Sequence, residues 1–171
     1  MGKRTSLDPQ QFRVYRMERE DIGARDYCRL TWKECARVAR SVCRAYGVSH
    51  VRLRHKVMGR WAAEWDGGII NLNPKKGTAT DLLTILHELA HHVHWHFADG
   101  EYNEHQDHGA EFMACYLSIL DTVRLIPRDA MATICDRRGL KYVNPGPSVK
   151  SLKLAIRTKS ARQRGAARAP R

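Results

Sequence analysis

The sequence lacks the features that mark membrane-spanning, secreted and disulfide-stabilised proteins. It contains no run of about 18 or more apolar residues, and its first residues, MGKRTSLDPQQ, lack the apolar stretch of a secretory signal. Its five cysteines are odd in number and include no Cys-x-x-Cys pair, so neither a disulfide framework nor a cysteine zinc ribbon is indicated. We therefore expect an intracellular protein, cytoplasmic or nucleoid-associated, with reduced and mostly buried thiols.

Acidic residues are absent from the end of the chain. Residues 148–171 contain eight Lys and Arg and no Asp or Glu, and residues 1–60 contain 15 basic against 6 acidic residues, whereas residues 61–147 contain 7 against 12. Basic ends suit a polyanion such as DNA, because each cation placed on a phosphate releases condensed counterions, although a solvated surface has the same composition. We expect DNA contacts from the N-terminal region and from the tail residues Lys150, Lys153, Arg157, Lys159, Arg162, Arg164, Arg168 and Arg171.

The patterns of apolar residues predict an α+β fold. Helical spacing and a Thr31 cap predict a helix over residues 31–47. Period-two alternation in HVRLRHKV, followed by RWAAEW and IINLN around an Asp66-Gly67 turn, predicts a small three-stranded antiparallel sheet. Thr78-x-x-Asp81 has capping-box spacing before the apolar run of a second long helix.

Two more helices are expected after the histidine-rich segment. Apolar residues at helical spacing predict one from Gly109 to about Leu125, and Pro127 separates it from a shorter one near residues 128–137. Pro and Gly in NPGPS indicate a linker. We therefore divide the chain into a basic N-terminal extension (1–30), a single domain (31–143) and a basic, flexible tail (144–171), and we expect a monomer.

Histidines are concentrated in one segment. Residues 87–112 hold seven of the nine, and they begin with the motif His87-Glu88-Leu89-Ala90-His91. On a helix, residues four apart lie about 40° from one another, so His87 and His91 can bind one ion. Glu88 projects beside that ion, where it can take a proton from water without being a ligand. This is the H-E-x-x-H arrangement of zinc hydrolases.

A catalytic zinc needs a third protein ligand and an open position for water. The segment NEHQDHGAEF offers His105, His108 and Glu111, with Glu104 and Asp107 as weaker choices. We prefer His108, because it enters the next helix and packing can hold it there. The metzincin pattern is excluded, since it requires Gly at position 94 and His at position 97, which are His and Phe here.

GGIINLNP, TILHELAHHVH and HGAEF together resemble the SprT-like zinc metalloprotease domain, over roughly residues 31–125. This family includes bacterial SprT proteins and the Spartan proteases that digest proteins crosslinked to DNA. The resemblance implies a minimal zincin-like domain built of an N-terminal helix, a small sheet, the H-E-x-x-H helix and following helices. It also implies one catalytic Zn²⁺ held by His87, His91 and His108, with Glu88 as the base. The cysteine zinc ribbon of many members is absent.

The expected activity is endopeptidase cleavage of DNA-associated proteins. Zinc lowers the pKa of bound water, and Glu88 accepts its proton as the peptide carbonyl is attacked. Tyr116 and Tyr102 are candidate oxyanion donors. An extended substrate could pair with an edge strand, because main-chain pairing demands no particular sequence. The candidate strand comprises Ile69, Ile70, Asn71, Leu72 and Asn73.

Two other functions fit the same residues. The chain could be a nucleic-acid-binding protein with a structural zinc, in which Glu88 has no catalytic role. It could also be a peptidase acting on one regulatory partner, as ImmA-like H-E-x-x-H proteins do. Retention of zinc with loss of cleavage after Glu88→Gln would favour an enzyme.

Overall fold

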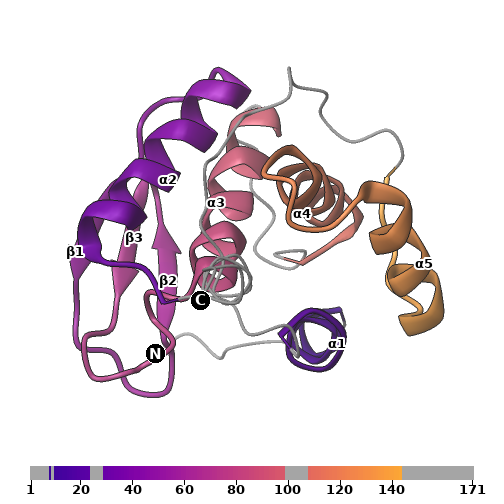
Figure 1. Ribbon diagram of the computed structural model, residues 1–171, viewed down its shortest axis with the longest axis horizontal. Coiled ribbons are helices and arrows are strands. Elements are labelled where there is room, and N and C mark those ends of the chain that lie inside the picture. Colours follow the sequence, from indigo (N-terminus) through magenta and orange to yellow (C-terminus); the bar gives the residue numbers. More distant parts are fainter. Residues whose placement is uncertain (1–7, 9, 24–28, 99–107, 144–171) are drawn as a thin grey trace, which may run out of the picture.

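The computed structural model describes residues 8, 10–23, 29–98 and 108–143. They form five α-helices, one π-helical turn and one sheet (Figure 1). None of the described helices is long and apolar enough to cross a membrane. In chain order the elements are α1 (Gln11–Met17), η1 (Glu18–Ile22), α2 (Trp32–Tyr46), β1 (Arg52–His55), β2 (Ala63–Asp66), β3 (Ile69–Leu72), α3 (Leu82–Phe97), α4 (Ala110–Thr122) and α5 (Arg128–Arg138).

The α+β class is confirmed, but the sheet is mixed and not antiparallel. Its order is β1-β3-β2, with β2 antiparallel and β1 parallel to β3. The predicted hairpin at Asp66-Gly67 pairs β2 with one edge of β3. Strand β1 pairs with the other edge of β3 and runs in the same direction as β3. Period-two alternation specifies which side chains share a face, but it does not specify a strand's partner or direction.

Helix α2 begins and ends where the sequence predicts. The Thr31 hydroxyl accepts a hydrogen bond from the Glu34 backbone, and the Glu34 carboxylate accepts one from the Thr31 backbone, which forms a capping box. Gly47 ends the helix in the left-handed conformation, with φ of 66°. The second predicted capping box is wrong: α3 begins at Leu82 with Asp81 as its N-cap and no side-chain cap, so Thr78 lies outside the helix.

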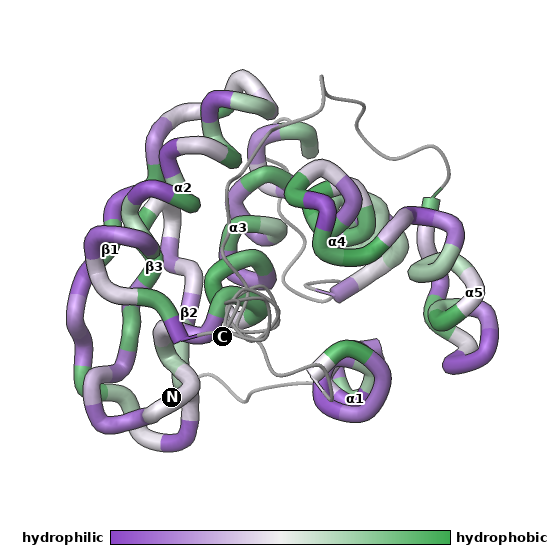
Figure 2. Tube along the Cα trace, in the orientation of Figure 1, coloured by the Kyte–Doolittle hydropathy of each residue, from purple (hydrophilic) through white to green (hydrophobic). Residues whose placement is uncertain are grey.

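Helices α3 and α4 pack against each other at the centre of the molecule, between the α2 and sheet layer and α5 (Figure 1). Both are rich in hydrophobic residues along their length (Figure 2). Leu86 and Leu89 of α3 and Phe112 and Leu117 of α4 are fully buried. The histidine motif therefore lies on a helix that is held on several sides by the core, which limits how far its side chains can move.

Helix α1 and turn η1, neither of which was expected from the sequence, are packed into the same core. Val14, Met17 and Ile22 are fully buried. The turn is tied to α5, since Arg138 Nε donates to Asp21 Oδ2 at 2.7 Å. Although residues 1–30 carry a basic excess, the described part of this segment places Val14, Met17 and Ile22 in the core and Asp21 against α5.

Four cysteines, Cys35, Cys43, Cys115 and Cys135, are free and buried, as predicted, and Cys28 lies outside the described residues. Burial raises the pKa of Cys35 to about 11 and the pKa of Cys115 and Cys135 to about 12. At pH 8 a thiol of pKa 11 is ionised in only about one molecule in a thousand, and the thiolate is the reactive form.

We therefore expect a Cys28→Ser variant to react with a disulfide reagent such as DTNB at least about a hundredfold more slowly when native than when unfolded. Absorbance at pH 8, with and without guanidinium, measures this. A fast reaction of one or more thiols in the native protein would show that a buried cysteine is accessible.

Candidate metal centre

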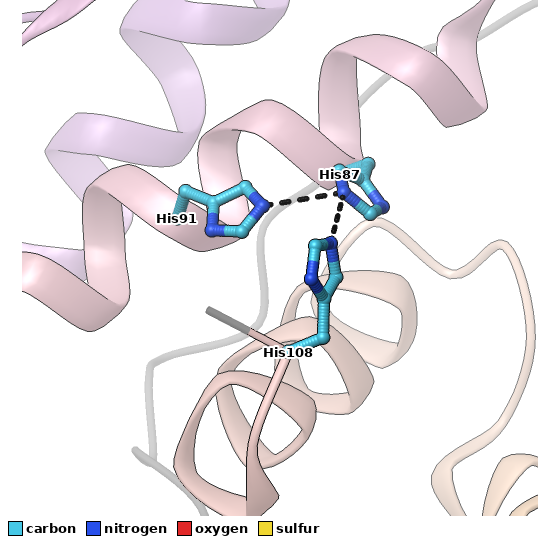
Figure 3. A group of neighbouring side chains, drawn as sticks. All are labelled: His87, His91 and His108. Atoms are coloured by element: carbon cyan, nitrogen blue, oxygen red, sulfur yellow. Dashed lines mark hydrogen bonds between the residues drawn. The ribbon is translucent and has the colours of Figure 1, made fainter. Parts of the chain in front are cut away.

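Three imidazoles from two segments converge on one point. His87 and His91 project from successive turns of α3, and His108 lies just before α4 and points toward them (Figure 3). His87 Nε2 lies 3.3 Å from His91 Nε2 and 3.1 Å from His108 Nε2. All three side chains are buried, and their nitrogens lie within 4.8 Å of one another. This cluster could hold a metal ion.

Two carboxylates, the buried Asp8 and the partly buried Glu18, accept hydrogen bonds from the ring nitrogens that face away from the cluster. Glu18 Oε1 lies 2.7 Å from His87 Nδ1, and Asp8 Oδ2 lies 3.1 Å from His108 Nδ1. An ionised carboxylate only accepts hydrogen bonds, so we assign the proton of both rings to Nδ1. Their Nε2 lone pairs then face each other at 3.1 Å, an arrangement that requires a proton or a metal ion between them.

Burial favours the neutral form of two of these ligands. It lowers the pKa of His91 well below its ordinary value, and the neighbouring His87 and His108 lower it further. Burial also lowers the pKa of His108, against the opposing hydrogen bond to Asp8. Neutral imidazoles are the form that binds a metal. The Nδ1 atom of His91 is buried and has no hydrogen-bond partner among the described residues.

The pKa of His87 changes in the opposite direction. Burial alone would lower it, but the charges of Glu18 and Glu88 and the hydrogen bond to Glu18 outweigh burial and raise it. In the absence of a cation these carboxylates therefore favour a proton on His87. A metal ion at the cluster must displace this proton, since metal and proton compete for the same lone pair.

Glu88 lies next to the cluster and is 8% exposed. Burial raises its pKa to about 7, against the opposing effects of His87 and of a hydrogen bond with the Trp65 backbone. The nearby carboxylates Glu18 and Glu64 contribute to the rise. A cation bound beside Glu88 would favour its carboxylate form and lower this pKa. A carboxyl group that exchanges a proton near neutral pH is suited to general acid–base chemistry.

The three histidines and Glu88 line one cavity of about 200 Å³. Its other walls come from β2 and the chain before it, through Trp61, Ala63 and Trp65, and from α1, through Tyr15. The Tyr15 ring lies 5.5 Å from the His87 ring and 5.4 Å from the His108 ring, measured between centroids. The candidate ligands are therefore accessible from a defined cavity, although each side chain is itself buried.

The other predicted site residues have different positions. Tyr116 is fully buried and its hydroxyl donates to Glu18 Oε1 at 2.7 Å, so it lies behind His87 and does not line the cavity as an oxyanion donor must. Glu111, a rival third ligand, has a side chain that is 72% exposed and lies 3.5 Å from His94 Nε2, outside the cluster. Tyr102, His105 and the tail cations from Lys150 onward lie outside the described residues.

The predicted substrate strand is also wrong. Ile69 to Leu72 form β3, which is the central strand, so its backbone pairs with β1 on one side and β2 on the other. Asn73, at its end, is fully buried and donates to Ala62. A strand with both edges paired has no backbone groups left for a peptide. Of the strands that the structure describes, β2 is the edge strand next to the cavity.

Sequence reasoning missed Asp8, Tyr15 and Glu18, although all three contact the cluster. They lie 69 or more residues before their histidine partners, and nothing in the local pattern links them to those partners. The only available signal was a weak one: the alternation of Val14, Met17 and charged residues is compatible with a short amphipathic helix.

Comparison of the chain with protein-family models, with curated proteins and with solved structures gives no match in any of the three.

Proposed function

We propose that this protein is a zinc-dependent metalloendopeptidase of the SprT-like type. The observation that carries the proposal is the convergence of His87, His91 and His108 on one point, with the buried carboxyl of Glu88 beside them in the same cavity. Three protein ligands facing a cavity are typical of catalytic zinc sites, whereas structural sites are closed by four. The family assignment is supported by the sequence motifs alone.

Two of the three separations between the ligand nitrogens fit zinc. Zn–N bonds of about 2.0–2.1 Å at tetrahedral angles separate two nitrogens by about 3.3 Å. The two measured separations from His87 Nε2 are 3.3 Å and 3.1 Å. Neutral imidazole is also a preferred zinc ligand, and the cluster contains no thiolate that would favour a softer metal.

When bound, zinc supplies a Lewis acid that polarises a carbonyl and lowers the pKa of water to about 7. In the proposed reaction Glu88 accepts the proton of the attacking water and delivers it to the leaving amine. The hydrogen bond with the Trp65 backbone orients its carboxyl group. The position of Glu88 supports this role, since its buried carboxyl group lines the same cavity as the three histidines, within reach of a proton there.

Strand β2 is the best candidate for substrate binding. Asn73 N–H donates to Ala62 O, so in the antiparallel register the backbone groups of Glu64 also face β3. Those of Ala63 and Trp65 face away from β3, and the Trp65 backbone bonds to Glu88. Ala63 and Trp65 both line the cavity. An extended peptide paired with the outward-facing backbone groups of Ala63 would pass close to Glu88, and main-chain pairing would give broad sequence specificity.

The proposal is tested by incubating zinc-loaded protein with casein and with a basic DNA-binding protein, with and without single-stranded DNA. We expect cleavage in the loaded sample and none after treatment with a chelator, with recovery on adding zinc back. Zinc bound at one equivalent with no cleavage of either substrate, with or without DNA, would contradict the proposal and favour a structural zinc.

DNA is the proposed partner, and the described residues add one surface to the predicted basic ends. Lys33, Arg37, Arg40 and Arg44 are all exposed on α2. At 100° per residue they fall within an arc of about 60°, opposite the buried face of the helix. Only Arg37 has a nearby acidic partner on this helix, since its Nη2 lies 3.9 Å from a Glu34 oxygen. A row of cations at this spacing suits a phosphate backbone.

We expect replacement of Arg40 and Arg44 by glutamine to weaken binding of single-stranded DNA and to reduce its salt dependence. Each phosphate contact contributes a slope of about −0.7 to log K against log salt concentration, so losing two makes the slope shallower by about 1.4. Fluorescence anisotropy of a labelled oligonucleotide at several salt concentrations measures this. A Lys75→Gln, Lys76→Gln variant is the matched control, and an equal change in both variants would show that net charge, and not this surface, is responsible.

A further inference from the structure

We propose that Asp8 and Glu18 are positioning residues for the metal ligands, and that the N-terminal segment 8–22 and the metal therefore bind to the rest of the protein cooperatively. The inference rests on the metal binding that is part of the proposed function, and it does not depend on proteolysis. Both residues precede the region that resembles the SprT-like domain, so that resemblance assigns them no role.

Glu18 contacts His87 at Nδ1, the ring nitrogen that faces away from the cluster. Its Oε1 atom lies 2.7 Å from His87 Nδ1 and also accepts the Tyr116 hydroxyl at 2.7 Å. The π-helical turn η1 begins at Glu18, and the Gly23 N–H closes it on the Glu18 carbonyl. A Cβ atom at Gly23 would lie 2.7 Å from that carbonyl oxygen, so the turn needs glycine there. The local backbone thus directs Glu18 at the ligand.

Asp8 holds His108 in a similar way. Its Oδ2 accepts hydrogen bonds from the backbone N–H of His108 and, at 3.1 Å, from Nδ1. Its Oδ1 accepts the Gln10 N–H at 2.9 Å, and the Gln10 side chain donates to the His108 carbonyl at 2.6 Å. His108 is therefore fixed through its backbone on both sides and through its ring. His108 follows residues 99–107, which the structure does not describe. Among the described residues, Asp8 and Gln10 of the N-terminal segment hold His108 in place.

The consequence for the metal follows from tautomer chemistry. A carboxylate on Nδ1 places the proton there, directs the Nε2 lone pair at the cluster and raises the basicity of the ring. Removal of such a partner commonly costs about 10- to 100-fold in metal affinity. His91 has no such partner among the described residues, so the two carboxylates serve the other two ligands.

Cooperativity follows because one segment carries both carboxylates. If docking of residues 8–22 strengthens metal binding, the bound metal must strengthen docking by the same factor. The docking contacts away from the cluster combine the buried side chains of Val14, Met17 and Ile22 with polar contacts to α5 and the chain after it. Arg138 bridges Glu20 at 2.9 Å and Asp21 at 2.7 Å, and Arg13 donates to the Gly139 carbonyl at 2.9 Å. The bound metal adds to these contacts, because opening of the segment would break the hydrogen bonds that hold two of the three metal ligands.

The test measures zinc affinity of the full chain by competition with a chromophoric chelator. We expect Asp8→Ala and Glu18→Ala each to weaken binding about 10- to 100-fold. Glu18→Gln keeps an acceptor oxygen and should recover much of the lost zinc affinity. If Glu18 acted only through its negative charge, Glu18→Gln would lose as much affinity as Glu18→Ala. Arg19→Gln is the control, since Arg19 lies in the same turn, its side chain is 76% exposed and its ion-pair partner is Glu20 of that turn. It should bind zinc within about twofold of the wild type.

A second readout is amide hydrogen exchange over residues 10–22. Zinc should slow this exchange in the wild type and in Arg19→Gln, and it should do so far less in Glu18→Ala. If circular dichroism shows that an alanine variant does not fold, Glu18→Gln and Asp8→Asn replace it, with an expected loss of affinity of up to about 10-fold.

The outcomes separate the two proposals. The positioning role is overturned if all the variants bind zinc with wild-type affinity, or if amide exchange over residues 10–22 is the same with and without zinc. Either result leaves the metalloprotease proposal standing. A wild-type protein that binds no zinc overturns both. Zinc binding that depends on Asp8 and Glu18, in a protein that cleaves nothing, supports the positioning role and counts against the protease.

Discussion

Replacing Glu88 by glutamine should abolish peptide cleavage while zinc stays bound. Glutamine has nearly the same shape, but its amide cannot accept and return a proton. Loss of a general base typically costs about 10²- to 10⁴-fold in rate. Because Glu88 projects beside the cluster and is not one of the three converging ligands, one equivalent of zinc should remain. Metal content by mass spectrometry and cleavage of casein, measured on the same sample, test both parts.

Glu111→Gln is the matched control for this experiment. Its carboxylate is 72% exposed and lies outside the cavity, so both zinc and cleavage should be retained. Cleavage by Glu88→Gln at the wild-type rate would show that another group is the base. Loss of zinc from Glu88→Gln would show that Glu88 binds the metal or is needed for the fold, and a thermal melt distinguishes these two explanations.

Replacing His108 by alanine should remove the stabilisation that zinc gives to the native protein. Zinc at about 100 times its Kd contributes about 2.7 kcal/mol to the stability of the wild type. For a chain of this size that corresponds to a rise in Tm of about 5 to 11 °C. With His108 removed, two imidazoles on one helix remain, and the expected shift at the same zinc concentration is close to zero. Scanning calorimetry with and without zinc measures this.

His96→Gln provides the comparison for the His108 variant. His96 lies on α3 but bonds to Ser49 at 2.8 Å and is not part of the cluster, so the zinc-dependent shift should be unchanged. A full shift in His108→Ala, together with its loss in His105→Ala, would mean that the third ligand has been assigned to the wrong histidine.

The histidine site was predictable in part because its first half is local. The four-residue spacing of His87 and His91 is sufficient to place both rings on one face of a helix. The third ligand was harder, since His105, His108 and Glu111 lie within one short segment and spacing does not rank them. The structure selects His108 among the described residues, because its backbone is held by Asp8 and Gln10. His105 lies outside them.

The errors in the sheet have a related cause. Each strand was identified correctly, and the Asp66-Gly67 hairpin formed as expected. The predicted antiparallel pairing of β1 was wrong, because the alternation of apolar and polar residues does not specify which strand is the neighbour. With β1 on the far side of β3, the strand IINLN is central, and the edge beside the cavity belongs to β2. The Tyr116 prediction failed because the position of a buried hydroxyl depends on its partner, here Glu18.

By itself the sequence determined the features that depend on neighbours a few residues apart: the capped helix α2, the hairpin, the pair of histidines on α3 and the placement of Glu88 beside them. Only the tertiary structure decided which distant groups complete the centre. Asp8 and Glu18 reach histidines 100 and 69 residues away because α1 and η1 pack on the same core as α3 and α4. Such contacts come from the burial of apolar surface across the whole chain, and no local spacing encodes them.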